Sequence, residues 1–131
     1  MLFHVMVGSN DIKRSKKFYD AVLHTFGVGE AILNKTASGH TRLFYRPEGG
    51  TNFCVSEPIN GEAATAGNGS TVAFSCNSLD QVRQFHDTAV AHGGTSIEDA
   101  PGPRDTSMGL IHLAYVRDPD GNKLCAIHLP T

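Results

Sequence analysis

The pattern of apolar and polar residues in the first part of the chain predicts one strand, one helix and then three further strands. Residues 2–7 form a short apolar run that predicts a strand, and Ser9-Asn10-Asp11 then offers helix N-caps. Gly27 provides a stop for the helix. Residues 29–34, 40–45 and 52–56 have the composition of strands. The apolar positions of the helix recur at helical spacing: Ile12, Phe18, Tyr19, Val22, Leu23 and Phe26.

The second part of the chain repeats this order of elements. Residues 71–76 predict a strand, Ser78 caps a helix, and Gly93-Gly94 ends it. Residues 95–98, 111–117 and 123–128 predict strands, and the Pro- and Gly-rich residues 100–108 predict a long loop. The last two strands are joined by Asp118-Pro119-Asp120-Gly121, a strong hairpin signal. The apolar or packing positions of the second helix are Leu79, Val82, Phe85, His86, Ala89 and Val90.

The two parts also align residue by residue. When His4 is placed on Thr71, Phe18 falls on Phe85 without a gap. A second ungapped register near the end of each part places Cys54 on Cys125. The same first register pairs Asn10 with Asn77 and Gly27 with Gly94, and the second pairs Arg46 with Arg117 and Gly50 with Gly121. The repeat predicts an α+β fold of two βαβββ halves, with Phe18 and Phe85 in equivalent core positions.

The repeat also predicts how the chain is organised. Residues 1–131 are expected to form one domain, with halves at about 1–57 and 70–131. Residues 58–69, which are rich in glycine and small residues and lack periodicity, are the predicted linker. Each half would be a small sheet with a helix on one face, and the two curved mixed sheets would enclose a shared cleft.

Composition narrows the classes of protein that fit. The 131 residues are 40% hydrophobic and 18% charged with a net charge of −2, which favours a globular protein and offers no basic stripe for nucleic acid. No apolar run predicts a membrane span, and the N-terminus lacks the features of a signal peptide. The three cysteines, Cys54, Cys76 and Cys125, each lie in a predicted strand, so we expect reduced thiols and a cytoplasmic location.

Two motifs resemble one known family. The opening His4-Val5-Met6-Val7 is followed by Asp11, Ser15, Phe18 and Tyr19 on the first helix, and residues 116–123 read Val-Arg-Asp-Pro-Asp-Gly-Asn-Lys. Together they resemble the glyoxalase/bleomycin-resistance/extradiol dioxygenase superfamily, also called the vicinal oxygen chelate superfamily. The resemblance covers nearly the whole chain, and it implies the glyoxalase-like fold of tandem βαβββ modules around a cleft.

The resemblance also implies where a metal ion would bind. Metal-dependent members take ligands from the first and last strands of each half, usually His or Gln and Glu. Transfer by position gives His4, Thr71, Cys54 and Cys125. Only His4 is a usual ligand, and both carboxylates are replaced by thiols, which hard ions disfavour. We therefore expect no metal and no other cofactor. The alternative is a divalent ion (Zn, Mn, Ni or Fe), with His4, Cys54 and Cys125 as a Cys₂His zinc set.

Three further residues are candidates for the cleft. His112 and Tyr115 are three positions apart on one predicted strand, so they face opposite sides of the sheet and only one can line the cleft. His112 in the cleft would be a candidate general base. Arg104 in the predicted loop 100–108 is a candidate clamp for an anionic ligand.

These expectations leave two main functions open, and a third interpretation is a degenerate enzyme with metal-free chemistry. The first is a protein that binds a small molecule in the inter-sheet cleft without the usual metal. The alternative is a metal-dependent lyase, isomerase or dioxygenase of the glyoxalase type, acting on a small oxygen-rich substrate. In either case we expect a small-molecule ligand as the partner, no nucleic acid or membrane, and a homodimer, because two-fold pairs are the commonest oligomers.

Overall fold

Each predicted half folds into a four-stranded sheet with one helix against one face. The computed structural model describes residues 1–130. The first half runs β1 (His4–Gly8), α1 (Ile12–His24), β2 (Ile32–Lys35), β3 (Thr41–Tyr45) and β4 (Asn52–Ser56). The second half runs β5 (Val72–Ser75), α2 (Leu79–Ala91), β6 (Thr95–Thr106), β7 (Gly109–Arg117) and β8 (Lys123–His128). The predicted α+β class with two βαβββ modules is confirmed.

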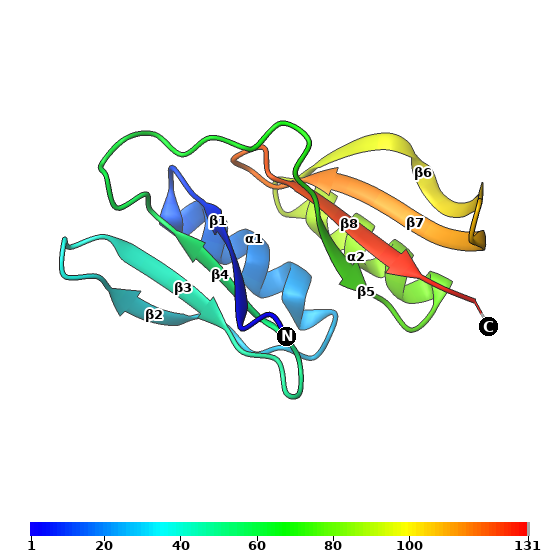
Figure 1. The fold of residues 1–131 in the computed structure, drawn as a ribbon, viewed down its shortest axis with the longest axis horizontal. Helices are drawn as coiled ribbons and strands as arrows, with labels where there is room; N and C mark the ends of the chain where they lie inside the picture. Colours follow the sequence, from blue (N-terminus) through cyan, green and yellow to red (C-terminus); the bar gives the residue numbers. More distant parts are fainter. Residues whose placement is uncertain (131) are drawn as a thin grey trace.

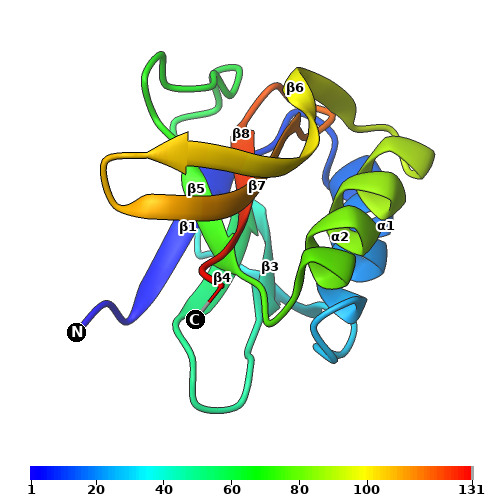
Figure 2. The same ribbon diagram turned by 90° about the vertical axis from the view of Figure 1, so that its right-hand side faces the viewer.

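The two sheets have the same topology. Their strand orders are β1-β4-β3-β2 and β5-β8-β7-β6. In each, the first strand pairs in parallel with the last, and the remaining pairs are antiparallel. Both helices lie on the same side of the molecule (Figures 1 and 2). We call the opposite side of each sheet its open face. The edge strands β1 and β5 lie next to each other at the centre of the molecule and do not pair.

The helices begin at the predicted caps and bury the predicted faces. The side chain of Asp11 accepts a hydrogen bond from the Arg14 amide, and Ser78 accepts one from the Gln81 amide. Phe18 and Phe85 occupy the seventh position of their helices, and both are fully buried, as the repeat predicts. The core joins the halves through an aromatic cluster in which Phe74 contacts three rings: those of Phe26, Phe53 and Phe85.

The prediction of a loop at residues 100–108 is wrong. β6 continues to Thr106 and pairs with β7 along most of its length, with a shift of register between Ile97 and Gly102. β6 is the edge strand of its sheet, so a proline can be accommodated where its missing N–H would face outward. At the shift, Glu98 adopts a φ of 60°, a backbone angle that residues other than glycine rarely adopt. Proline and glycine here mark a bulged edge strand.

A buried polar cluster connects the β7–β8 hairpin to the start of α1. Asp118 accepts a hydrogen bond from the Tyr19 hydroxyl at 2.5 Å, and Asp120 accepts one from the Ser15 hydroxyl at 3.1 Å. The Asn122 side chain donates to the Gly8 carbonyl at 3.0 Å. We call Ser15, Tyr19, Asp118, Asp120 and Asn122 the hairpin lock. It joins residues about one hundred positions apart, and all of its members belong to the two motifs that carry the family resemblance.

The segment between the halves crosses the end of the molecule at which the β7–β8 hairpin lies (Figure 1). Residues 58–69 contain no helix or strand. The Asn10 side chain accepts from the Ala64 amide at 2.7 Å and donates to the Ala64 carbonyl at 3.0 Å. Gly8 lies so close that a Cβ there would be 2.9 Å from the Ala64 Cβ. The segment is therefore held against the end of β1 by paired hydrogen bonds and by close packing.

Candidate functional site

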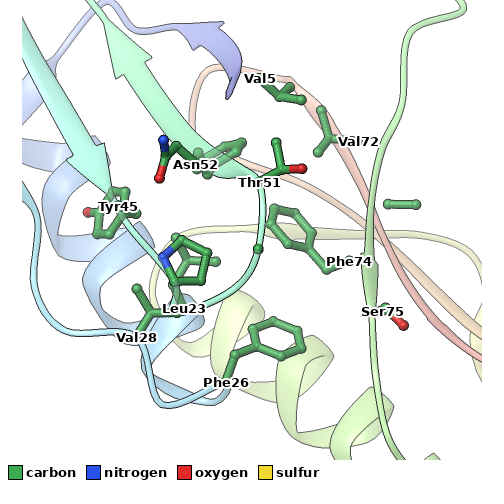
Figure 3. A pocket seen from close by; sticks show the side chains of 14 residues that line it. Val5, Leu23, Phe26, Val28, Tyr45, Thr51, Asn52, Val72, Phe74 and Ser75 are labelled. Carbon is green, nitrogen blue, oxygen red and sulfur yellow. The ribbon is translucent and has the colours of Figure 1, made fainter. Parts of the chain in front are cut away.

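A cavity of about 390 Å³ lies between the two sheets, beside the free edges of β1 and β5. Figure 3 shows its lining, with Val5 and Val72 near each other at one side and the Phe74 and Phe26 rings below them. The walls come from both halves of the chain, from the end of α1 and from the β3–β4 hairpin. The residues that give the cavity its apolar character are Val5, Phe26, Val28, Phe53, Val72 and Phe74.

The cavity lies where the first half lacks a hairpin lock. In the alignment of the repeats, Asp118 and Asp120 of the β7–β8 hairpin correspond to Pro47 and Gly49 of the β3–β4 hairpin. Ser15 of α1 corresponds to Val82 of α2. The β3–β4 hairpin therefore has no carboxylate at the two aligned positions, and α2 has no hydroxyl at the position that aligns with Ser15. Pro47 and Gly50 border the cavity without closing it.

The lining offers few polar groups. None of its residues is an Asp, Glu, Lys, Arg or His. The Tyr45 hydroxyl donates to the Asp20 carboxylate at 2.7 Å, and burial raises the pKa of Tyr45 far above its usual value. The Tyr45 hydroxyl therefore stays neutral, and its proton is used in the hydrogen bond to Asp20. The cavity fits an apolar, preferably aromatic, group.

A second hollow of about 260 Å³ adjoins this cavity on the open face of the first sheet. We call it the open-face groove, and Phe3, His4, Ile32, Phe44, Arg46, Asn52 and Cys54 line it. Asn52 lines both hollows. The two hollows therefore adjoin at Asn52, and the groove contains an imidazole and a guanidinium.

The structure keeps each pair of expected ligand positions on its own sheet. His4 and Cys54 line the open-face groove, whereas Cys125 belongs to β8 and Thr71 precedes β5. Within residues 1–130, no group of three or more His, Cys, Asp or Glu side chains is arranged to hold a metal ion. Burial raises the pKa of the Cys54 and Cys125 thiols, which disfavours the thiolate form that binds metal. The donor set of this chain does not fit the divalent ion that the family resemblance implies.

Tyr115 and Cys125 lie opposite each other on the open face of the second sheet. They are partners in the β7–β8 register. The Lys123 ammonium lies 4.6 Å from the centre of the Tyr115 ring and 2.5 Å from the Glu98 carboxylate. The pKa values of Tyr115 and Cys125 are both raised, primarily by burial. The Tyr115 hydroxyl and the Cys125 thiol are therefore neutral, and the charges of Lys123 and Glu98 compensate each other.

His112 faces the other way. It shares a face with Ala114 and Val116, which belong to the core beneath the helices. Its Nδ1 atom lies 2.9 Å from that of His128, and the two rings stack. Of the two alternatives on this strand, Tyr115 is the one on the open face, and the candidate general base lies on the helix side.

Arg104 binds the backbone of its own strand. Its guanidinium donates to the carbonyl oxygens of Asp99 and Ala100 at 3.1 and 3.0 Å, and to those of Gly102 and Pro103 at 3.3 Å. These four carbonyls border the bulge of β6. The guanidinium N–H groups of Arg104 are therefore largely used in hydrogen bonds that stabilise the bulge, and few remain for a ligand.

The sequence alone did not identify the aromatic walls of the inter-sheet cavity. Phe26, Phe53 and Phe74 follow the helix or strand periodicity of core residues, so nothing in the pattern distinguishes a side chain that borders a cavity from one in the core. In the sequence, Arg46 is distinguished only by its alignment with Arg117. Its place beside the open-face groove depends on how the strands of the first sheet pair, which no local pattern encodes.

Comparison with known proteins agrees with the fold and with the arrangement of the motifs. The sequence profile of the Glyoxalase/Bleomycin resistance protein/Dioxygenase superfamily matches residues 1–126. The chain belongs to this superfamily. A crystal structure of a glyoxalase/bleomycin resistance protein from Albidiferax ferrireducens T118 is 50% identical, with a TM-score of 0.91 over 98% of this chain and 99% of that one.

More distant members of the superfamily share the fold. A glyoxalase-related enzyme from Fulvimarina pelagi is 20% identical with a TM-score of 0.73, over 99% of this chain and 88% of that one. A glyoxalase I mutant from Zea mays is 22% identical with a TM-score of 0.70, over 95% of this chain and 44% of that longer one. Among curated proteins, none matches this sequence. No helix in residues 1–130 has the length and hydropathy needed to cross a membrane.

Proposed function

We propose that this superfamily member binds a small organic molecule in the inter-sheet cavity and that binding requires no metal ion. The supporting observation is the cavity itself, since a volume of about 390 Å³ lies within the range of small-molecule sites. Apolar side chains from both halves line it, with few polar groups to fix an orientation. This combination is typical of ligand pockets.

The donor chemistry supports the metal-free form of the proposal. A catalytic zinc site needs about three protein ligands, and thiols bind metal as thiolates. Here the expected positions provide one imidazole, one hydroxyl and two buried thiols with raised pKa values. The metal-dependent lyase, isomerase or dioxygenase has no comparable support from the described residues.

The cavity can be tested with 2-naphthamide, an uncharged aromatic probe. We expect saturable one-to-one binding by calorimetry. Val5→Phe would place a ring beside Val72 and fill space that the probe needs, so its dissociation constant should rise at least about tenfold, equivalent to about 1.4 kcal/mol. Val72→Phe, on the facing strand β5, provides a second blocking variant.

Val90→Phe is the matched control, because Val90 is 44% exposed on α2 and does not line the cavity. It should bind the probe as the wild type does. The proposal is wrong if wild-type protein does not bind 2-naphthamide, or if both blocking variants fold and bind it with wild-type affinity.

We further propose a homodimer in which a second copy covers the open face of the first sheet. Phe3, Met6 and Ile32 on or beside this sheet are 76%, 37% and 56% exposed. Exposed apolar residues grouped in this way often mark an interface. A second copy on this face would also close the open-face groove over a bound ligand.

A further inference from the structure

We propose that the ligand carries a carboxylate or similar anionic group, which Arg46 binds in the open-face groove. This inference rests on the proposed function, because it places the apolar part of the same ligand in the inter-sheet cavity. It assigns the ligand to one chemical class: an organic acid with an aromatic or otherwise bulky apolar body.

Arg46 is the one arginine of residues 1–130 without a hydrogen-bond or ion-pair partner. Arg14 and Arg83 pair with carboxylates. Arg42 donates to the Ser56 hydroxyl, and Arg104 to four carbonyls. A guanidinium presents five N–H donors in a planar fork that matches a carboxylate. The donors of Arg46 are thus available to a ligand.

The repeat shows that this freedom is particular to the first half. Arg117, which aligns with Arg46, donates to the Gly121 carbonyl of its own hairpin at 2.7 Å. In the first half Arg46 makes no corresponding bond to the aligned Gly50. Its side chain instead lines the groove. Arg117 therefore stabilises its hairpin, whereas the aligned Arg46 lines the open-face groove.

The charge around Arg46 favours an anion. Its groove is lined by no Asp or Glu, and His4 is the other residue there that can carry positive charge. The Asn52 side chain has no hydrogen-bond partner within residues 1–130 and can donate its amide N–H to the same group. Because Asn52 also borders the inter-sheet cavity, the proposed anion site adjoins the apolar site at this residue.

The test compares 2-naphthoate with 2-naphthamide, which have the same rings and differ in charge. By calorimetry, wild-type protein should bind 2-naphthoate about tenfold more tightly, because an arginine–carboxylate pair is charge-assisted and often bidentate. Arg46→Gln should abolish this preference and leave 2-naphthamide binding unchanged. Arg46→Lys should keep part of it, since the charge remains and the fork is lost.

Arg83→Gln is the control for net charge, because Arg83 lies on α2 and lines neither hollow. It should retain the full preference. If 2-naphthamide binds but wild type shows no preference for 2-naphthoate, or if Arg46→Gln keeps the preference, the anion inference is wrong and the cavity proposal stands. If neither probe binds, the proposed function itself fails.

Discussion

Asp118 is a buried carboxylate that the fold uses to join its two halves. One of its oxygens accepts from the Tyr19 hydroxyl and the Asn122 side chain, and the other accepts from the amides of Asp120 and Asn122. Burial and the charge of Asp118 raise the pKa of Tyr19 well above its usual value, so the phenol keeps its proton and donates. Every acceptor position of Asp118 is thus matched to a donor.

Removal of this carboxylate should destabilise the protein strongly. Asp118→Ala leaves the Tyr19 hydroxyl and two backbone amides without their acceptor, and we expect the free energy of unfolding to fall by about 2–4 kcal/mol. Urea unfolding measures the loss. Asp105→Ala, at an exposed position on β6, should change stability by less than about 0.5 kcal/mol. Equal effects of the two variants would show that the hairpin lock does not stabilise the fold.

The role of the lock residues could not be read from the sequence, although the residues themselves could. The resemblance singled out Ser15, Tyr19 and the run from Asp118 to Asn122. Local pattern explains Asp118-Pro119-Asp120-Gly121 as a turn, which it is. The contact with α1 depends on how two halves about one hundred residues apart pack together, and no local pattern encodes that packing.

At the scale of the elements, β6 shows how a side chain can stabilise an irregular strand. Glu98 has a left-handed backbone conformation, which costs a non-glycine residue about 1 kcal/mol or more. Arg104 offsets part of this cost by donating to carbonyls within the bulge and at its end. The ion pair between Glu98 and Lys123 fixes the bulge to β8.

Arg104→Ala should therefore loosen β6 without affecting the ligand. Hydrogen exchange of the β6 amides should become about five- to tenfold faster, equivalent to about 1 kcal/mol of local stability, while 2-naphthoate affinity stays at the wild-type value. Arg83→Ala is the control for loss of an exposed arginine and should leave β6 exchange unchanged. Weaker 2-naphthoate binding in Arg104→Ala would instead support Arg104 as an anion clamp.

The elements themselves were predicted well where periodicity is strong and poorly where glycine and proline dominate. α1 and α2 begin at the predicted caps, since Asp11 and Ser78 carry side chains that satisfy the first free amides. The predicted loop at residues 100–108 is a strand, because at a sheet edge Pro103 loses no hydrogen bond to a second neighbour. Whether a strand lies at the edge of a sheet is decided by the fold, so the local sequence could not predict it.

At the scale of the whole molecule, one repeat is locked and the other is open. The second half inserts its hairpin against α1 through Asp118 and Asp120, whereas the first half has Pro47 and Gly49 at the aligned positions. The inter-sheet cavity lies at the end of the molecule where the first half lacks these polar residues.

The proposed dimer is a prediction at this scale. Light scattering at micromolar concentration should give twice the mass of the 14.0 kDa chain. Ile32→Glu places a charge on the exposed face of the first sheet and should shift the protein to the monomer, because burial of an unpaired charge is costly. Val90→Glu, at an exposed position on α2, should remain dimeric. A monomer mass for the wild type would rule the dimer out.

The central claim is that the inter-sheet cavity binds a small molecule without a metal ion. The most direct test is a calorimetric titration of 2-naphthamide into protein purified without a metal-affinity tag, with and without a chelator, on samples of known metal content. We expect no stoichiometric zinc, manganese, nickel or iron, and the same dissociation constant in both titrations. One metal ion per chain that His4→Ala removes, together with binding that the chelator abolishes, would contradict it and favour the metalloenzyme.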